Sequence, residues 1–108
     1  MTHRSWAAAV LASPLLALAH GHPGSIDPDH PESWKYRLCG EMVTVAIQAV
    51  HDRDRGREMK RYPEDGTPGP AIANAVIRKV YAEPGIASPK RAETFGRAYC
   101  MEQLQESR

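Results

Sequence analysis

The sequence predicts an all-α protein, namely a small three-helix antiparallel bundle with one disulfide and a disordered N-terminal arm. Three stretches of the 108-residue chain place apolar residues at helical spacing, and no stretch alternates apolar and polar residues as a strand would. The chain has two cysteines, one in the first stretch and one in the third. Because a chain of this length holds one small domain, we expect a single helical domain over residues 32–106.

Residues 1–19 have the pattern of a secretory signal peptide. A short basic opening with Arg4 precedes an apolar run, Trp6–Leu18. The run is shorter than the roughly 20 residues that span a bilayer, and Ala17 and Ala19 fit the small-residue positions of a signal-peptidase site. We therefore expect cleavage after Ala19 and a periplasmic or secreted mature protein that does not span the membrane.

Residues 20–31, HGHPGSIDPDHP, are rich in proline and nearly free of apolar side chains, which predicts a flexible N-terminal arm. Cleavage after Ala19 would expose an amino terminus followed by His20, Gly21 and His22. The α-amine, two backbone amides and the His22 imidazole could then form the square-planar nitrogen set that Cu(II) and Ni(II) prefer. The alternative is a soluble polar segment without a metal, and the sequence leaves both hypotheses open.

Two adjacent rows of apolar side chains mark the first helix, predicted over residues 32–55. Asp29 or His30 is expected to serve its start, and Gly56 is expected to end it. We expect the core to be formed by both rows, which consist of Trp34, Leu38, Met42, Val45 and Ala49, and of Cys39, Val43, Ala46 and Val50.

Residues 57–69 begin with helix formers and end rich in proline and glycine, which predicts a short helical turn followed by a loop. The second helix is predicted over residues 70–82, with Thr67 or Gly69 as its cap. Its expected buried stripe is Ile72, Ala73, Val76, Ile77 and Val80.

Ser88 followed by proline predicts the start of a third helix over residues 89–105. Short connections favour opposite directions for the first and third helices, so that Cys39 can reach Cys100. In an oxidising compartment the two are expected to form a disulfide, worth about 4 kcal/mol for a loop of roughly 60 residues. The side chains expected to face the core are Ala92, Phe95, Tyr99, Cys100 and Leu104.

Several short motifs follow one another along the chain, namely Cys39, Arg53-Asp54-x-Gly56, Val80-Tyr81, Pro84-Gly85, Ser88-Pro89 and Tyr99-Cys100. Their order resembles a loose class of small exported bacterial helical proteins that have two cysteines and no assigned function. The resemblance covers about residues 36–100 and implies an exported helical protein.

The sequence lacks the motifs of common catalytic, zinc and phosphate sites. We interpret His51-Asp52 as a solvated pair at a helix end rather than a catalytic dyad. The 14 Lys and Arg residues nearly balance the 13 Asp and Glu residues, which disfavours a nucleic-acid partner. We therefore expect no enzymatic activity.

One basic run is a candidate for contact with an anionic surface. Interleaved acids weaken its field, so a solvated helix end that complements the helix dipole is the favoured interpretation. The cations of the run are Arg53, Arg55, Arg57, Lys60 and Arg61.

The expected function is that of a non-enzymatic binding module for an unidentified protein or small ligand. A three-helix domain of this size has little interior left for a catalytic pocket once its core is filled. Two alternatives stay open: Cu(II) or Ni(II) binding through His20, Gly21 and His22, and a periplasmic stress chaperone. Exported acid-activated chaperones are similar in outline, being small, helical and held by one disulfide.

Overall fold

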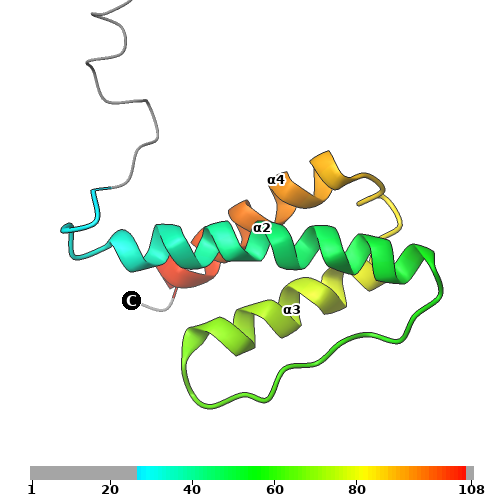
Figure 1. The fold of residues 1–108 in the computed structure, drawn as a ribbon, viewed down its shortest axis with the longest axis horizontal. Helices are drawn as coiled ribbons and strands as arrows, with labels where there is room; N and C mark the ends of the chain where they lie inside the picture. Colours follow the sequence, from blue (N-terminus) through cyan, green and yellow to red (C-terminus); the bar gives the residue numbers. More distant parts are fainter. Residues whose placement is uncertain (1–26, 107–108) are drawn as a thin grey trace, which may run out of the picture.

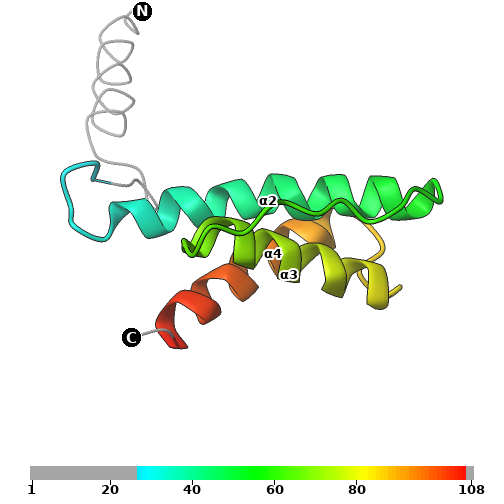
Figure 2. The ribbon, with the colours of Figure 1, turned by 90° about the horizontal axis from the view of Figure 1, so that it is seen from below.

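Three helices form the framework of residues 27–106, the part of the chain that the computed structural model describes. They are α2 (Ser33–Asp54), α3 (Pro68–Ala82) and α4 (Pro89–Glu106), and no strand occurs in this range. Figure 2 shows α3 and α4 packed on the same side of the longer α2. The prediction of an all-α fold with three helices is confirmed.

The directions of the helices follow from the lengths of their connections. The short connection 83–88 turns the chain back after α3, so that α4 runs opposite to α3 and, as expected, to α2 (Figure 1). The linker, residues 55–67, is longer and returns along the length of α2, so that α3 runs in the same direction as α2 (Figure 1). Only α4 is therefore antiparallel to the other two helices.

The linker has no helical turn, which corrects the expectation for its first half. Residues 57–65 are irregular, because the Asn74 side chain of α3 forms hydrogen bonds with both the N–H and the carbonyl of Tyr62. The Tyr62 N–H donates to Asn74 Oδ1 at 2.9 Å, and Asn74 Nδ2 donates to the Tyr62 carbonyl at 2.9 Å. These contacts with another helix override the local preference of helix-forming residues.

The core lies where the three helices meet. The whole predicted stripe of α3 is buried, and most of the two rows of α2 are buried or half-buried. Trp34 is an exception with 40 % exposure. It lies one turn before Leu38, whose Cδ1 atom would be 3.7 Å from a Cβ atom at Gly69 in the first turn of α3.

Gly96 sets the close approach of α4 to α2. It lies in a buried row of α4 formed by Ala92, Gly96, Cys100 and Leu104. A Cβ atom at Gly96 would lie 2.6 Å from the Met42 carbonyl oxygen and 3.0 Å from the Ala46 Cβ. The two helices can therefore pack at this distance only because residue 96 has no side chain.

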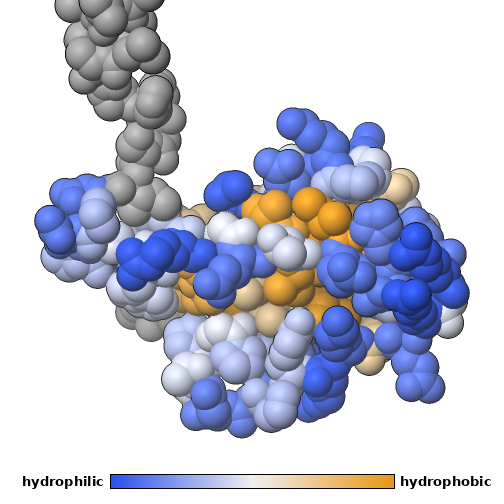
Figure 3. Space-filling view, viewed as in Figure 1, coloured by the Kyte–Doolittle hydropathy of each residue, from blue (hydrophilic) through white to orange (hydrophobic). Residues whose placement is uncertain are grey.

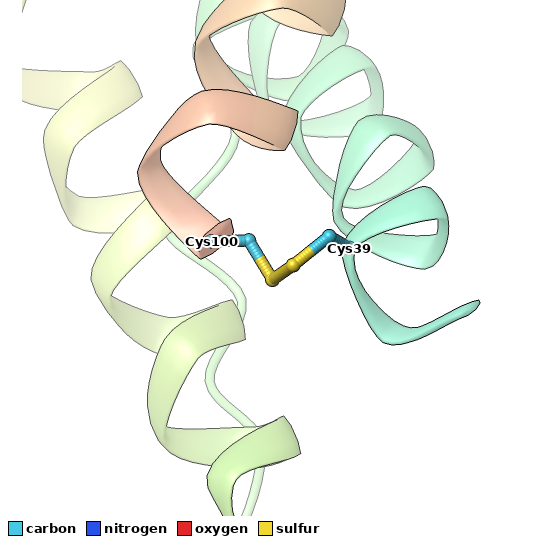
Figure 4. Close-up of a disulfide and its surroundings, with 2 residues drawn as sticks. All are labelled: Cys39 and Cys100. Atoms are coloured by element: carbon cyan, nitrogen blue, oxygen red, sulfur yellow. A yellow bond between two sulfur atoms is a disulfide. The ribbon is translucent and has the colours of Figure 1, made fainter. Parts of the chain in front are cut away.

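The predicted disulfide between Cys39 and Cys100 is confirmed. The two Cα atoms lie 5.4 Å apart, and the residues are separated by 61 positions in the chain. Both are buried, with exposures of 1 % and 0 %. Figure 4 shows the bond bridging the space between α2 and α4, so that the first and last helices are covalently joined.

The helix starts agree only in part with the expected caps. Ser88 Oγ accepts a hydrogen bond from the Arg91 N–H at 3.2 Å, as expected for a cap. Thr67 precedes α3, but its hydroxyl donates to Asp65 instead of capping the helix. His30 Nδ1 accepts from the Glu32 N–H at 3.0 Å, just before α2 begins.

The end of the expected arm, residues 27–31, is exposed and forms turns. Asp27 Oδ1 accepts the Asp29 N–H at 3.0 Å, and Ser33 Oγ donates to the Pro28 carbonyl at 3.3 Å. The rest of the arm and the expected signal peptide lie outside the described residues. Within those residues no helix has the length and apolar character needed to cross a bilayer.

Candidate functional site

An apolar groove of about 410 Å³ lies between α2, the start of α3 and the linker. Figure 3 shows apolar residues gathered along the middle of the face seen in Figure 1, with hydrophilic residues around them. The lining residues of the groove come from α2, from the start of α3 and from the linker that passes beside them. It is lined by Leu38, Met42, Val45, Tyr62, Pro63, Pro70 and Ala73, together with Gly69 and Glu41.

The sequence spacing of α2 explains its share of the groove. Leu38, Met42 and Val45 follow one another at helical spacing and so lie on one face of the helix. Met42 and Ala73 are buried, whereas Leu38 and Val45 are half-buried and Tyr62 is exposed. The groove thus has a closed apolar floor and walls whose side chains still reach solvent.

Glu41 is the charged residue that lines the groove. It is exposed, and no hydrogen bond or ion pair engages it in the part of the chain that the structure describes. Its carboxylate therefore leaves an uncompensated negative charge at the rim of an apolar surface.

Asn74 fixes the linker that borders the groove. Asn74 is 2 % exposed, and its side chain forms hydrogen bonds with both the N–H and the carbonyl of Tyr62. Asn74 Nδ2 also donates to Glu64 Oε2 at 2.9 Å. Sequence reasoning missed this residue. Its position could have indicated this role, because Asn74 is a polar residue between Ala73 and Val76 in an otherwise apolar stripe. A buried amide needs hydrogen-bond partners.

Tyr81 holds the first half of the linker. Its hydroxyl donates to the Arg57 carbonyl at 2.9 Å and lies 3.4 Å from the Glu58 carbonyl. Burial raises the pKa of this hydroxyl, and the Asp52 carboxylate raises it further. Tyr81 therefore remains a hydrogen-bond donor at all ordinary pH values.

Asp52 lies beneath the linker, which corrects the interpretation of His51-Asp52 as a solvated pair. Asp52 is 7 % exposed, whereas His51 is exposed. The carboxylate accepts from Gln48 Nε2 at 3.1 Å and from the Arg57 guanidinium at 3.2 Å. The hydrogen bond from Gln48 is the main cause that lowers the pKa of Asp52, and Arg57 and Lys60 lower it further.

Arg53 contacts the carboxyl end of α3 rather than solvent. Its guanidinium donates to the carbonyls of Val80, Glu83 and Ile86 at 2.8, 3.2 and 2.9 Å. The cation therefore complements the dipole of a neighbouring helix, whereas the sequence suggested a role at the end of its own helix.

The rest of the basic run is exposed. Arg57 keeps 60 % of its side chain exposed while it pairs with Asp52, and Arg55, Lys60 and Arg61 are exposed as well. A small cavity of about 20 Å³ between the linker and the helices has Lys60 among its lining residues. Two of the five predicted contact residues, Arg53 and Arg57, thus hold the fold together.

The predicted metal site at His20, Gly21 and His22 lies outside the described residues. Within those residues no group of three His, Cys, Asp or Glu side chains is placed to hold a metal ion.

Comparisons of the chain with protein-family models, with curated proteins and with solved structures find no match.

Proposed function

We propose that this chain is an exported, non-enzymatic binding module that holds a short apolar polypeptide segment in the groove between α2 and α3. The observation that carries the proposal is the groove itself, which has a volume of about 410 Å³ and lies beside the Glu41 carboxylate, a group without a partner among the described residues. Apolar surface left open to water favours a partner that covers it.

The shape of the groove favours a polypeptide over a small ligand. Sites for small molecules usually enclose most of the ligand surface. Leu38 and Val45 are only half-buried and Tyr62 is exposed, so the walls contact a ligand on one side and leave its other side to solvent. A peptide side chain can enter such a groove while its backbone stays hydrated.

The charge at the rim specifies the partner further. Glu41 has no cationic partner among the described residues, so a Lys or Arg next to the apolar segment would complement it. An exposed pair of this kind contributes about 0.2–1 kcal/mol, which is enough to set the orientation of the segment rather than its affinity.

Export is supported by two observations that are independent of the groove. Residues 1–19 have the pattern of a signal peptide, and disulfides such as Cys39–Cys100 persist mainly in oxidising compartments. We therefore propose a periplasmic or secreted location. There the module would bind exposed apolar segments of other exported proteins. A stress chaperone would act by binding of this kind.

The binding test uses the mature chain and a fluorescent peptide of leucine and alanine flanked by lysine. Val45→Glu places a charge in the groove wall and is expected to weaken binding by about tenfold or more. Thr44→Glu adds the same charge at an exposed position of α2 outside the groove lining and is the matched control. Equal affinity of the two variants would exclude the groove as the binding site.

The rim charge is tested by reversal. Glu41→Lys is expected to weaken binding of the lysine-flanked peptide and to strengthen binding of a glutamate-flanked peptide. Glu102→Lys reverses an exposed charge on α4 and controls for the change in net charge. If both variants change affinity alike, the partner responds to overall charge and the proposed role of Glu41 is wrong.

A further inference from the structure

The linker is held by hydrogen bonds and an ion pair rather than by burial. Residues 55–67 are all exposed, including Met59 at 50 % and Tyr62 at 38 %. Their anchors are few: Asn74 binds Tyr62 and Glu64, Tyr81 binds the Arg57 carbonyl, and Asp52 binds the Arg57 side chain. A segment with few buried apolar contacts opens more easily than the helices beneath it.

An apolar surface lies under this linker. The cavity of about 20 Å³ between linker and helices is lined by Val45, Ala49, Ile77 and Tyr81, together with polar groups. Ala49 and Ile77 are buried. Val45 and Tyr62 line both this cavity and the groove described above, so the covered surface continues the groove along α2 and α3.

Carboxylates take part in the anchors. Asp52 is faced by Gln48 on its own helix, by Arg57 and Lys60 on the linker, and by the Tyr81 hydroxyl on α3. Glu64 accepts a hydrogen bond from Asn74, whereas Asp65 accepts two from Thr67 within the linker itself. Hydrogen bonds to an ionised carboxylate are stronger than those to its neutral form, so protonation weakens each anchor.

The helices themselves are held differently. The disulfide joins α2 to α4, and the stripe of α3 is packed in the core. Neither contact depends on a carboxylate. Acid therefore acts on the linker before it acts on the helix packing.

From this arrangement we propose that the linker is an acid-released lid whose detachment extends the apolar groove along α2 and α3 toward Tyr81. The proposal rests on the proposed function, because it describes the regulation of the same groove. With the lid in place the groove admits a short apolar segment. With the lid released it admits a longer one.

The direction of the pH dependence follows from the carboxylates. The pKa of Asp52 is lowered mainly by its hydrogen bond to Gln48, and the pKa of Asp65 is lowered mainly by its hydrogen bond to the Thr67 hydroxyl. Their contribution is therefore complete above the ordinary aspartate value of about 3.9 and is lost as the pH falls through the lower folded values. Release is expected below about pH 4.

Hydrogen exchange measured by mass spectrometry on the mature protein tests the release. The Arg57 N–H donates to the Asp52 carbonyl of α2 and the Tyr62 N–H donates to Asn74 of α3, so both report attachment of the linker. Between neutral pH and pH 3 their protection is expected to fall by about tenfold or more, while amides within α2 and α4 stay protected. Linker amides that stay protected until the helices also exchange would overturn the proposal.

Two variants separate the lid from general acid unfolding. Asp52→Asn removes the ionised anchor and is expected to raise linker exchange already at neutral pH. Asp54→Asn changes an exposed carboxylate two residues away, with 56 % of its side chain exposed, and should leave linker exchange unchanged. Equal linker protection in both variants would show that Asp52 does not hold the lid.

Peptide length distinguishes this proposal from the proposed function. Asn74→Asp places a negative charge against Glu64 and is expected to release the lid at neutral pH. Circular dichroism of this variant shows whether the helices remain folded. A lengthened lysine-flanked peptide should then bind several-fold tighter than it does to the unmodified protein, whereas the short peptide, which loses contact with Tyr62 and Pro63, should gain no affinity. Absence of binding by either peptide refutes the proposed function. Equal affinity of both proteins for the long peptide refutes the lid.

Discussion

The Arg53 guanidinium donates a hydrogen bond of 2.8 Å to the Val80 carbonyl and so joins the carboxyl end of α2 to that of α3. The last carbonyls of a helix lack intrahelical partners and carry partial negative charge, and one cation satisfies both needs. The contact is possible because α2 and α3 run in the same direction. It fixes the end of the bundle opposite to the disulfide.

Arg53→Ala should therefore lower the free energy of unfolding by about 1–3 kcal/mol, the range for hydrogen bonds that involve a charged group. Chemical denaturation of the mature protein measures this. Arg55→Ala removes an exposed arginine two residues away and should change stability by less than about 0.5 kcal/mol. Equal effects would mean that the three carbonyl contacts add nothing to stability.

Gly96→Ala should destabilise the fold by about 1–3 kcal/mol, because the new Cβ meets the Met42 carbonyl oxygen at 2.6 Å. Alanine normally favours a helix over glycine by about 1 kcal/mol, so the sign of the effect is diagnostic. Gly40→Ala in α2 meets nothing within 4 Å and should be neutral or stabilising. Thermal unfolding of the two variants checks this. A more stable Gly96→Ala protein would contradict the close helix packing.

Reduction of the Cys39–Cys100 bond should lower the thermal midpoint by more than about 10 °C. The bond joins residues that are 61 positions apart in the chain. A loop of this length is worth about 4 kcal/mol, and a domain of this size shifts by about 4–8 °C per kcal/mol. Calorimetry with and without reductant measures the shift, and free-thiol titration confirms the redox state. Two reactive thiols in untreated exported protein would contradict the bond.

The acid limb of the stability curve should depend on Asp52. Because the folded pKa of Asp52 is lowered, its contribution is present above about pH 4 and is lost as the pH falls further. Asp52→Asn should therefore lose stability at neutral pH and show a flatter decline toward pH 2. Denaturant titrations at several pH values test this. Parallel pH curves for the variant and the unmodified protein would contradict the assignment.

The amino-terminal Cu(II) hypothesis concerns residues outside the described range and stays a prediction. Mature protein that begins at His20 should bind one Cu(II) and show the visible absorption band of square-planar nitrogen coordination. His22→Ala should abolish the band, whereas His51→Ala should leave it intact. One extra residue before His20 should abolish it too, because His22 then leaves the third position. A correctly processed chain without the band would refute the hypothesis.

Local features of the sequence predicted what depends on local contacts. The three helices, the buried stripe of α3 and the Ser88 cap follow from apolar spacing and cap chemistry, and two cysteines allow one pairing. The linker was predicted wrongly at Tyr62 because its backbone bonds to Asn74, twelve residues later. Contacts between distant segments override local propensity, and a single sequence does not display them.

The candidate groove could not be predicted for a related reason. Leu38 and Met42 appeared as core residues, and the sequence does not show that the linker leaves part of this row uncovered. Arg53 appeared as a cation at the end of its own helix, because its three carbonyl partners come from residues 80–86. Both errors trace to the parallel course of α2 and α3, which depends on the length and path of the linker.

The disulfide also determines how the chain responds to a mechanical load and to cleavage by a protease. Cys39 lies in the second turn of α2 and Cys100 in the second half of α4, so a pull on the two ends passes through the sulfur bridge. Most of α2, all of α3 and the linker lie inside the covalent ring and outside the line of force. A protease that cuts the exposed linker once opens this ring but releases no fragment. The nicked molecule therefore stays in one piece until the bond is reduced.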